Sequence, residues 1–343
     1  MASFTIVTAS TVAQILNDGE AGVIAHTGSL STLGNSITST GSVSISVLGS
    51  LFGQSSAIEH NGENFTLNIG QTASVAGGSS DTVDVDFVGL VFISNDGSVL
   101  SDSDALDIRG TGSIGILNNG SISGRSDGIV TSGTGGLTQI VNLGTIWGND
   151  GGIDHLSGNS QLINYGTIFG NFYGFDGASN VDQVSNYGLI HGDVNLGAGN
   201  DVFKGQNGTV VGVVNGGSGN DTITCGAGDD ILVGGAGRDI LRGGGGNDFF
   251  DFNSTDDSVR GTNRDQIRDF KRGDKIDLAG IDANINADGN QKFKFIGDNV
   301  FSKKAGELRF KNDILQGDVN GDGKADFEIL VNVNNLVKGD FVL

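Results

Sequence analysis

Residues 216–252 read GGSGNDTITCGAGDDILVGGAGRDILRGGGGNDFFDF, and this stretch decides how the chain folds. An aspartate recurs every nine residues, and a large apolar residue stands two positions after each aspartate. Glycine fills most of the positions between them, and glycine permits the tight backbone curves that other residues disfavour. A regular series of like charges repels itself, so the spacing predicts a structure that binds cations. The recurring aspartates are Asp221, Asp230, Asp239 and Asp248.

The chain as a whole is acidic. It has 343 residues, with 60 Gly, no Pro, one Cys and a formal net charge of −21. An acidic surface repels phosphate, so cations and not nucleic acids are the expected partners. The single cysteine, Cys225, excludes an internal disulfide. No signal peptide is recognisable, and no segment approaches the roughly 20 apolar residues of a membrane helix, so we expect no membrane insertion.

A looser unit recurs before the nine-residue repeats. In it a Gly is followed two residues later by an aliphatic residue, at intervals of 20 to 27 residues, which predicts one turn of a parallel β-solenoid per unit. Asparagines two residues before each Gly should face inward and hydrogen-bond along the axis. The aliphatic column is Leu30, Leu51, Val99, Ile122, Ile146, Ile168, Ile190 and Val210, with Thr72 as an exception, and the asparagines are Asn68, Asn95, Asn118, Asn142, Asn164 and Asn186.

We predict an all-β protein in four segments. Residues 1–27 form a cap or first edge, and residues 28–195 form a right-handed parallel β-solenoid. The solenoid continues into a parallel β-roll over residues 196–252, followed by a small β-rich cap over residues 253–343. The insertion GGSSDTVDVD, residues 77–86, is interpreted as a solvated loop.

The nine-residue unit GGxGxDxUx, where U is a large apolar residue, resembles the calcium-binding repeat of RTX proteins. The resemblance implies that two units form one turn and that loops two repeats apart share a calcium ion bound by oxygen ligands. Asp221 would share an ion with Asp239, and Asp230 with Asp248. LGAGNDVFK at 196–204 adds Asp201 to the first row. Folding would then depend on calcium. The loop glycines expected at the metal sites are Gly216, Gly234 and Gly243.

The segment GTNRDQIRDFKRGDKIDLAG, together with GDVNGDGKADFEILV, resembles the C-terminal region of serralysin-type RTX proteins, which Gram-negative bacteria export by type I secretion. The terminal residues 340–343, DFVL, resemble the acidic-then-apolar export signal of that family. The resemblance implies an extracellular or cell-surface protein that folds on calcium outside the cell. It also suggests Asp269 and Asp277 as caps of the last ion, with plain surface carboxylates as the alternative.

Asp318, Asn320 and Asp322, followed by Gly323, copy the start of an EF-hand loop. Position twelve of that loop is Ile329 instead of Glu, so the ligand pattern is incomplete. Two interpretations stay open, an additional calcium site and a tight polar hairpin.

The catalytic motif of serralysins is not found. Their HExxH zinc motif is absent, because the four histidines, His26, His60, His155 and His191, are scattered, and this excludes a zinc protease. The alternative enzyme class is a polysaccharide lyase or epimerase, since YGFDG at 173–177 faintly resembles the YGFDP motif of alginate epimerases. Asp176 would then be catalytic, with His155 and Asp154 as helpers, although no paired acid and base is evident.

Outward positions of the solenoid carry aromatic side chains that should stack on neighbouring turns: Trp147, Phe169, His191, Tyr165 and Tyr187. They could form a platform for sugar rings or a contact with another protein, or lie covered by loops. The preferred function is a non-enzymatic secreted structural or adhesive protein that binds calcium and associates with itself or with surface polysaccharide. A secreted toxin is a third class, which no amphipathic segment supports.

Overall fold

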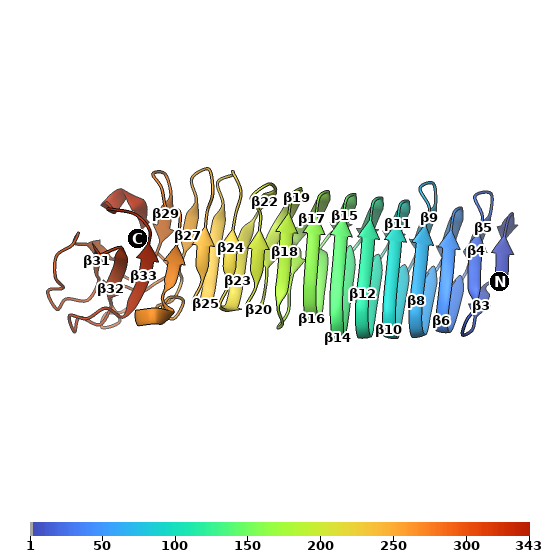
Figure 1. Ribbon diagram of the computed structural model, residues 1–343, viewed down its shortest axis with the longest axis horizontal. Coiled ribbons are helices and arrows are strands. Elements are labelled where there is room, and N and C mark those ends of the chain that lie inside the picture. Colours follow the sequence, from blue (N-terminus) through green and yellow to red (C-terminus); the bar gives the residue numbers. More distant parts are fainter. Residues whose placement is uncertain (1–2) are drawn as a thin grey trace. The chain divides into compact units, whose positions relative to one another are not determined.

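The computed structural model describes residues 3–343 and is nearly all β (Figure 1). Its helical elements are two short 3-10 helices, η1 (Gly261–Asn263) and η2 (Lys338–Asp340). The chain divides into two compact units, unit 1 (Met1–Val194) and unit 2 (Asn195–Leu343). Nearly all strand pairings are parallel, so the predicted all-β class and parallel β-solenoid are confirmed.

A full turn of unit 1 has one short strand and one long strand that bends in the middle. Strands of successive turns pair in parallel and in sequence order, as the blue-to-green part of Figure 1 shows. The first strands are β1 (Phe4–Ile6), β2 (Ala9–Ser10), β3 (Gln14–Leu16) and β4 (Ala21–Ile24). The short strands are β5 (Ser29–Thr32), β7 (Ser50–Gly53), β9 (Ser74–Gly77), β11 (Ser98–Ser101), β13 (Ser121–Gly124) and β15 (Thr145–Gly148). The long strands are β6 (Ile37–Val47), β8 (Ile58–Ile69), β10 (Val83–Asn95), β12 (Leu106–Asn118), β14 (Ile129–Asn142) and β16 (Gly151–Asn164), and the last turns contain β17 (Thr167–Asp176), β18 (Asp182–Asn186) and β19 (Leu189–Asn195).

Several long strands contain a glycine with a positive φ angle near the middle. Gly41 in β6 and Gly158 in β16 have φ angles of 68° and 96°, in the left-handed region that residues with a Cβ disfavour. Elsewhere along the strands successive side chains point to opposite faces, so a buried aliphatic residue alternates with an outward polar one. The aliphatic side chains therefore form a continuous core inside the turns.

One member of the predicted aliphatic column is wrong. Val75, and not Thr72, pairs with Leu51 on one side and with Val99 on the other, and its side chain is fully buried. Val210, which lies in unit 2, is half-buried. The other predicted members are buried as expected: Leu30, Leu51, Val99, Ile122, Ile146, Ile168 and Ile190.

The same turn also displaces the asparagine column. Ile69 is the residue that pairs with Asn95, and Asn68 is exposed to solvent. The reason is the corner after β8, which holds four residues (70–73) where the corner after β10 holds two (96–97). Counting from the glycine of this corner therefore assigned the wrong residues to both columns.

The remaining asparagines form a buried ladder. Each donates its side-chain amide to the amide oxygen of the next, from Asn95 to Asn118, Asn142, Asn164 and finally Asn186, over 2.8 to 2.9 Å. The same Nδ2 also donates to a backbone carbonyl of the following turn. An amide carries both donors and acceptors, so a column of asparagines satisfies itself.

One predicted loop is partly a strand, and the start of the chain matches one of the two alternatives predicted for it, a first edge. Residues 77–86 are not a solvated loop throughout, because β10 begins at Val83, and Val83 and Val85 are fully buried. Phe4–Ile6 pairs with β4, so residues near the start of the chain form an edge of the solenoid itself.

Unit 2 begins as a roll in which each turn has two strands of two to seven residues. One side contains β21 (Val202–Lys204), β24 (Thr222–Thr224), β26 (Ile240–Arg242) and β28 (Asp265–Ile267). The other contains β20 (Ala198–Gly199), β23 (Val213–Gly219), β25 (Ile231–Gly237), β27 (Phe249–Asp251) and β29 (Lys275–Asp277), and β22 (Thr209–Val211) precedes β23. The large apolar residues two positions after the repeat aspartates are fully buried in the roll: Phe203, Ile223, Leu232, Leu241 and Phe250.

The C-terminal part of unit 2 extends both sides of the roll. β31 (Glu307–Lys311), β32 (Ile314–Asp318) and β33 (Phe327–Val331) form an antiparallel meander, with β30 (Lys294–Phe295) beside β31. β33 also pairs in parallel with β28, and β34 (Phe341–Val342) pairs in parallel with β29. The segment predicted as an export signal thus supplies the last strand of the roll.

Candidate metal sites

The aspartates of the nine-residue repeat lie in two rows along the roll. In the first row, Oδ1 of Asp221 accepts the backbone N–H of Asp201, and Oδ1 of Asp239 accepts that of Asp221, each over 2.8 Å. In the second row, Oδ1 of Asp248 accepts the N–H of Asp230 over 3.1 Å. The structure therefore brings together the pairs that the repeat spacing indicated, and one oxygen of each acceptor fixes the loop of the neighbouring turn.

The second oxygen of several of these carboxylates does not bind the neighbouring loop. Oδ2 of Asp221, Asp230 and Asp239 is buried and accepts no hydrogen bond from the described protein. A buried oxygen without a donor is costly, and a buried carboxylate is more costly still. A calcium ion would satisfy these oxygens, because it prefers carboxylate and carbonyl ligands. The residues present fit the cation that the repeat predicts.

Burial also changes the proton affinity of the rows. It raises the pKa of Asp221 and of Asp230 to about 6, and the pKa of Asp239 to about 7. The neighbouring carboxylate of Asp248 raises the pKa of Asp230 further. A site that holds protons this tightly in the absence of metal must release them when a cation binds.

The predicted loop glycines are required by these carboxylates. A Cβ added to Gly216 would overlap Oδ2 of Asp221, and one added to Gly234 would overlap Oδ2 of Asp239. Gly243 stands in the same relation to Asp248. Glycine at this position leaves the space in which the carboxylate folds back over its own loop.

Both rows extend one turn beyond the predicted residues. Oδ1 of Asp265 accepts the N–H of Asp239 over 2.7 Å, and Oδ1 of Asp274 accepts the N–H of Asp248 over 3.1 Å. Oδ2 of Asp265 is buried without a hydrogen-bond partner, and burial, with Asp239 nearby, raises the pKa of Asp265 to about 9. Neither residue was among the predicted ligands, although the signal was present. They lie nine residues apart, and each precedes a buried Ile by two positions.

The second row ends differently from the first. The ammonium group of Lys271 donates to the Gly244 carbonyl over 2.7 Å and to Oδ2 of Asp248 over 3.0 Å, and it lies 3.3 Å from Oδ1 of Asp274. A protein cation therefore neutralises the last step of the second row. Asp269, a suggested cap, accepts the N–H groups of Gly243 and Gly244.

The other suggested metal ligands have local roles in the structure. Asp277 accepts the N–H of Ala279, two residues on in the chain. In the loop that resembles an EF-hand, both oxygens of Asp318 accept loop N–H groups, from Gly321 and Gly323. Asn320 donates to Asp326, and Asp322 accepts the N–H of Lys324. The loop joins the antiparallel strands β32 and β33.

The residues considered for catalysis do not converge. His155 is buried inside the solenoid, where Nδ1 lies 2.9 Å from Oγ1 of Thr131 and Nε2 lies 3.0 Å from the Gly158 carbonyl. Burial lowers the pKa of His155. Asp154 precedes it in β16 and points to the opposite face, where it pairs in register with Asp176. Of these residues, the two aspartates share one face and the histidine does not.

Asp154 and Asp176 belong to an acidic face of unit 1. Strand register aligns acidic side chains on successive turns, interrupted at Val130: Glu59, Asp84, Asp107, Asp154 and Asp176. Burial, together with Asp127 and Asp176, raises the pKa of Asp154 to about 6. Burial raises the pKa of Asp107 to about 7, and the nearby Arg109 opposes that increase.

The predicted outward stacking of aromatic rings is confirmed. The rings of Trp147 and Phe169 lie 6.2 Å apart between centroids and 9° from parallel, and those of Phe169 and His191 lie 4.5 Å apart. Tyr165 and Tyr187 stack at 4.9 Å and are 56% and 43% exposed, so no loop covers them. Tyr165 and Tyr187 therefore form a solvent-accessible pair on unit 1, whereas Trp147, Phe169 and His191 are half-buried.

The buried carboxylate rows and the glycine loops form a β-roll of the kind that the calcium-binding repeat implies. The family model described as "Peptidase M10 serralysin C terminal" matches residues 75–343, so the chain belongs to that family. A comparison with curated proteins found no match. Membership indicates a calcium-binding domain of the type carried by exported proteins. Over the residues that the structure describes, no helix has the length and apolar character needed to cross a membrane.

Proposed function

We propose that this chain is a secreted structural or adhesive protein of the bacterial cell surface or extracellular matrix, which folds on calcium outside the cell and catalyses no reaction. The observation that carries the proposal is the pair of buried carboxylate rows in unit 2, in which Oδ2 of Asp221, Asp230 and Asp239 lacks a protein donor. Such rows are suited to a chain that stays unfolded where calcium is scarce and folds where calcium is abundant.

Unit 1 supports the structural or adhesive part of the proposal. Its core is a regular stack of turns held by backbone pairing and by the asparagine ladder. Its surface carries the stacked pair Tyr165 and Tyr187, which are large apolar side chains left accessible to a partner. Stacked rings suit contact with the flat faces of sugar rings or with the same surface of a second copy.

The proposal is tested by following assembly and surface binding in calcium and in chelator. Electron microscopy and light scattering of the purified protein should reveal ordered assemblies or binding to isolated cell-surface polysaccharide in calcium. A Tyr165→Ser, Tyr187→Ser variant should fold normally and lose that association, whereas a Tyr173→Phe control, altered away from the exposed pair, should keep it. Monomers that bind no surface material in calcium would contradict the proposal.

A polysaccharide-modifying enzyme is the second candidate, and one observation favours it. Asp154 and Asp176 are adjacent in register, and the raised pKa of Asp154 resembles that of an acid–base group. The acidic face around them repels uronic acid polymers, which argues against a lyase or epimerase. Incubation with acidic and neutral polysaccharides, followed by NMR of the products, tests this candidate, and an Asp176→Asn variant supplies the control.

A further inference from the structure

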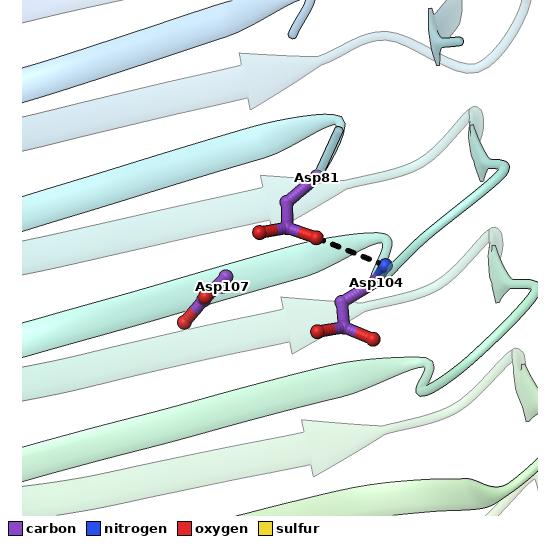
Figure 2. Close-up of side chains that lie close together, drawn as sticks. All are labelled: Asp81, Asp104 and Asp107. Carbon is purple, nitrogen blue, oxygen red and sulfur yellow. Dashed lines mark hydrogen bonds between the residues drawn. The ribbon is translucent and has the colours of Figure 1, made fainter. Parts of the chain in front are cut away.

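We propose a calcium site in unit 1, formed by the carboxylates of Asp81, Asp104 and Asp107. One oxygen from each of the three side chains lies within 4.8 Å of the others. Figure 2 shows the three carboxylates gathered at one corner of the solenoid, where the segment before β10 meets the start of β12 on the next turn. Neither the nine-residue repeat nor the EF-hand-like loop includes any of these residues, so the site is separate from those in unit 2.

The buried member of the cluster points to a ligand. Asp107 is only 5% exposed, and its Oδ1 accepts no hydrogen bond within the described chain. Its Oδ2 pairs with the guanidinium of Arg109 over 2.8 Å. Arg109 therefore compensates one oxygen of this carboxylate, and the other oxygen stays buried without a donor. A buried acceptor in this position requires a cation or a proton.

The backbone holds the other two carboxylates in place. Oδ1 of Asp81 accepts the N–H of Asp104 over 3.1 Å, as drawn in Figure 2, and Oδ1 of Asp104 accepts the N–H of Asp127 over 2.9 Å. Each turn thus places its aspartate against the next, and these contacts fix the carboxylates without neutralising them. The arrangement is preorganised for a positive ion.

Charge and ligand type select a hard divalent cation. Asp84 pairs in register with Asp107, so four carboxylates lie near a single guanidinium, that of Arg109. All the available ligands are oxygens, which excludes metals that depend on nitrogen or sulfur. Three carboxylates from two turns, together with water, match the flexible coordination of calcium better than the strict octahedron of magnesium.

Equilibrium dialysis of the full chain against radioactive calcium tests the proposal by counting bound ions. Asp107→Asn should bind one ion fewer per chain than the wild type, and so should Asp81→Asn, which covers the case in which the buried variant fails to fold. Asp86→Asn is the matched control, because Asp86 is exposed on the same β10 strand and makes the same charge change outside the cluster. It should keep the wild-type number.

Hydrogen exchange locates the ion. Calcium should slow exchange of residues 81–85 and 104–109 in the wild type and in Asp86→Asn, and this protection should disappear in Asp107→Asn. Asp239→Asn, which damages a unit 2 site, should retain it, so the proposed site can fail or succeed separately from the calcium dependence of the roll. Ion counts of Asp107→Asn and Asp81→Asn equal to that of the wild type would overturn the proposal. So would calcium protection confined to residues 195–343, or equal protection of residues 81–85 and 104–109 by magnesium at the same concentration.

Discussion

Units 1 and 2 both contain columns of stacked polar side chains, but the two columns differ in residue type and charge. Both stack a polar side chain at one position of successive turns, an asparagine from Asn95 to Asn186 in unit 1 and an aspartate in unit 2. The Asn118 amide accepts from one neighbour and donates to the next, each over 2.8 Å. Asp239 can only accept, so one oxygen receives a backbone N–H and the other is left buried without a donor. A neutral ladder completes itself, whereas a row of carboxylates needs a cation.

Removal of calcium should cause the largest difference between the two units. In chelator, residues 195–343 should lose their β-structure, because the rows of unit 2 then repel one another, while unit 1 stays folded. Circular dichroism gives the overall loss of β-signal, and hydrogen exchange assigns it to segments. Slow exchange across Thr222–Thr224 and Ile240–Arg242 in chelator would refute the expectation, and magnesium at equal concentration serves as the control.

A carboxylate placed in the asparagine ladder should give the next largest effect. Asn142→Asp removes the amide group that donates to Asn164 and to the Thr167 carbonyl, and it buries a charge, so unit 1 should lose about 3 kcal/mol or more of unfolding free energy. Calcium should not restore it, because this position lacks the glycine loop. Acid pH should restore part of it, since a protonated carboxyl can donate. Urea unfolding measures the loss, and exposed Asn180→Asp is the control, expected to change little.

Asp239→Asn, the reverse change in unit 2, should stabilise the metal-free roll but weaken its folding on calcium. Asp239→Asn removes a buried charge, so the metal-free roll should become more stable. The calcium concentration at which unit 2 folds should rise by at least the roughly tenfold that loss of even an outer-shell partner costs a metal site. A calcium titration followed by circular dichroism measures both. Exposed Asp256→Asn should leave the midpoint unchanged, and a lower midpoint for Asp239→Asn would contradict the assignment.

Protons should partly replace calcium in the rows. Burial raises the folded-state pKa of Asp239 to about 7 and of Asp221 to about 6, above the value of about 3.9 in an unfolded chain. The folded state then binds more protons, so this contribution to stability is complete below about pH 4 and is lost as the pH rises through 6 to 7. In chelator, unit 2 should therefore show more β-structure at pH 5 than at pH 8. The opposite order would contradict the burial of these groups without metal.

The smallest expected effect concerns Lys271, whose ammonium group neutralises the end of the second row. Lys271→Gln removes the ammonium beside Asp248, so the metal-free roll should lose up to about 1 kcal/mol, a modest amount because the lysine is partly exposed. Urea unfolding at pH 5 in chelator measures it. Lys338→Gln, remote from the rows in sequence, is the control. An increase in stability would mean that the lysine does not compensate the row.

The regular parts of the fold were predictable because their spacing is constant. Asp221 and Asp239 are separated by two repeats, so the partner of each follows from counting. The prediction failed where the count changes. The corner after β8 holds two residues more than the corner after β10, and this assigned Asn68 to a column that Ile69 occupies. Insertions change register without leaving a mark in the local sequence pattern.

The sequence by itself determined the stacked turns, the two carboxylate rows and the need for a cation, because each depends on periodicity. The tertiary structure decided where the rows end, since Asp265 and Asp274 follow a longer turn. It also decided that Asp81 and Asp107, 26 residues apart, lie at one corner. Such neighbours are set by strand register across turns of unequal length, which no local pattern records.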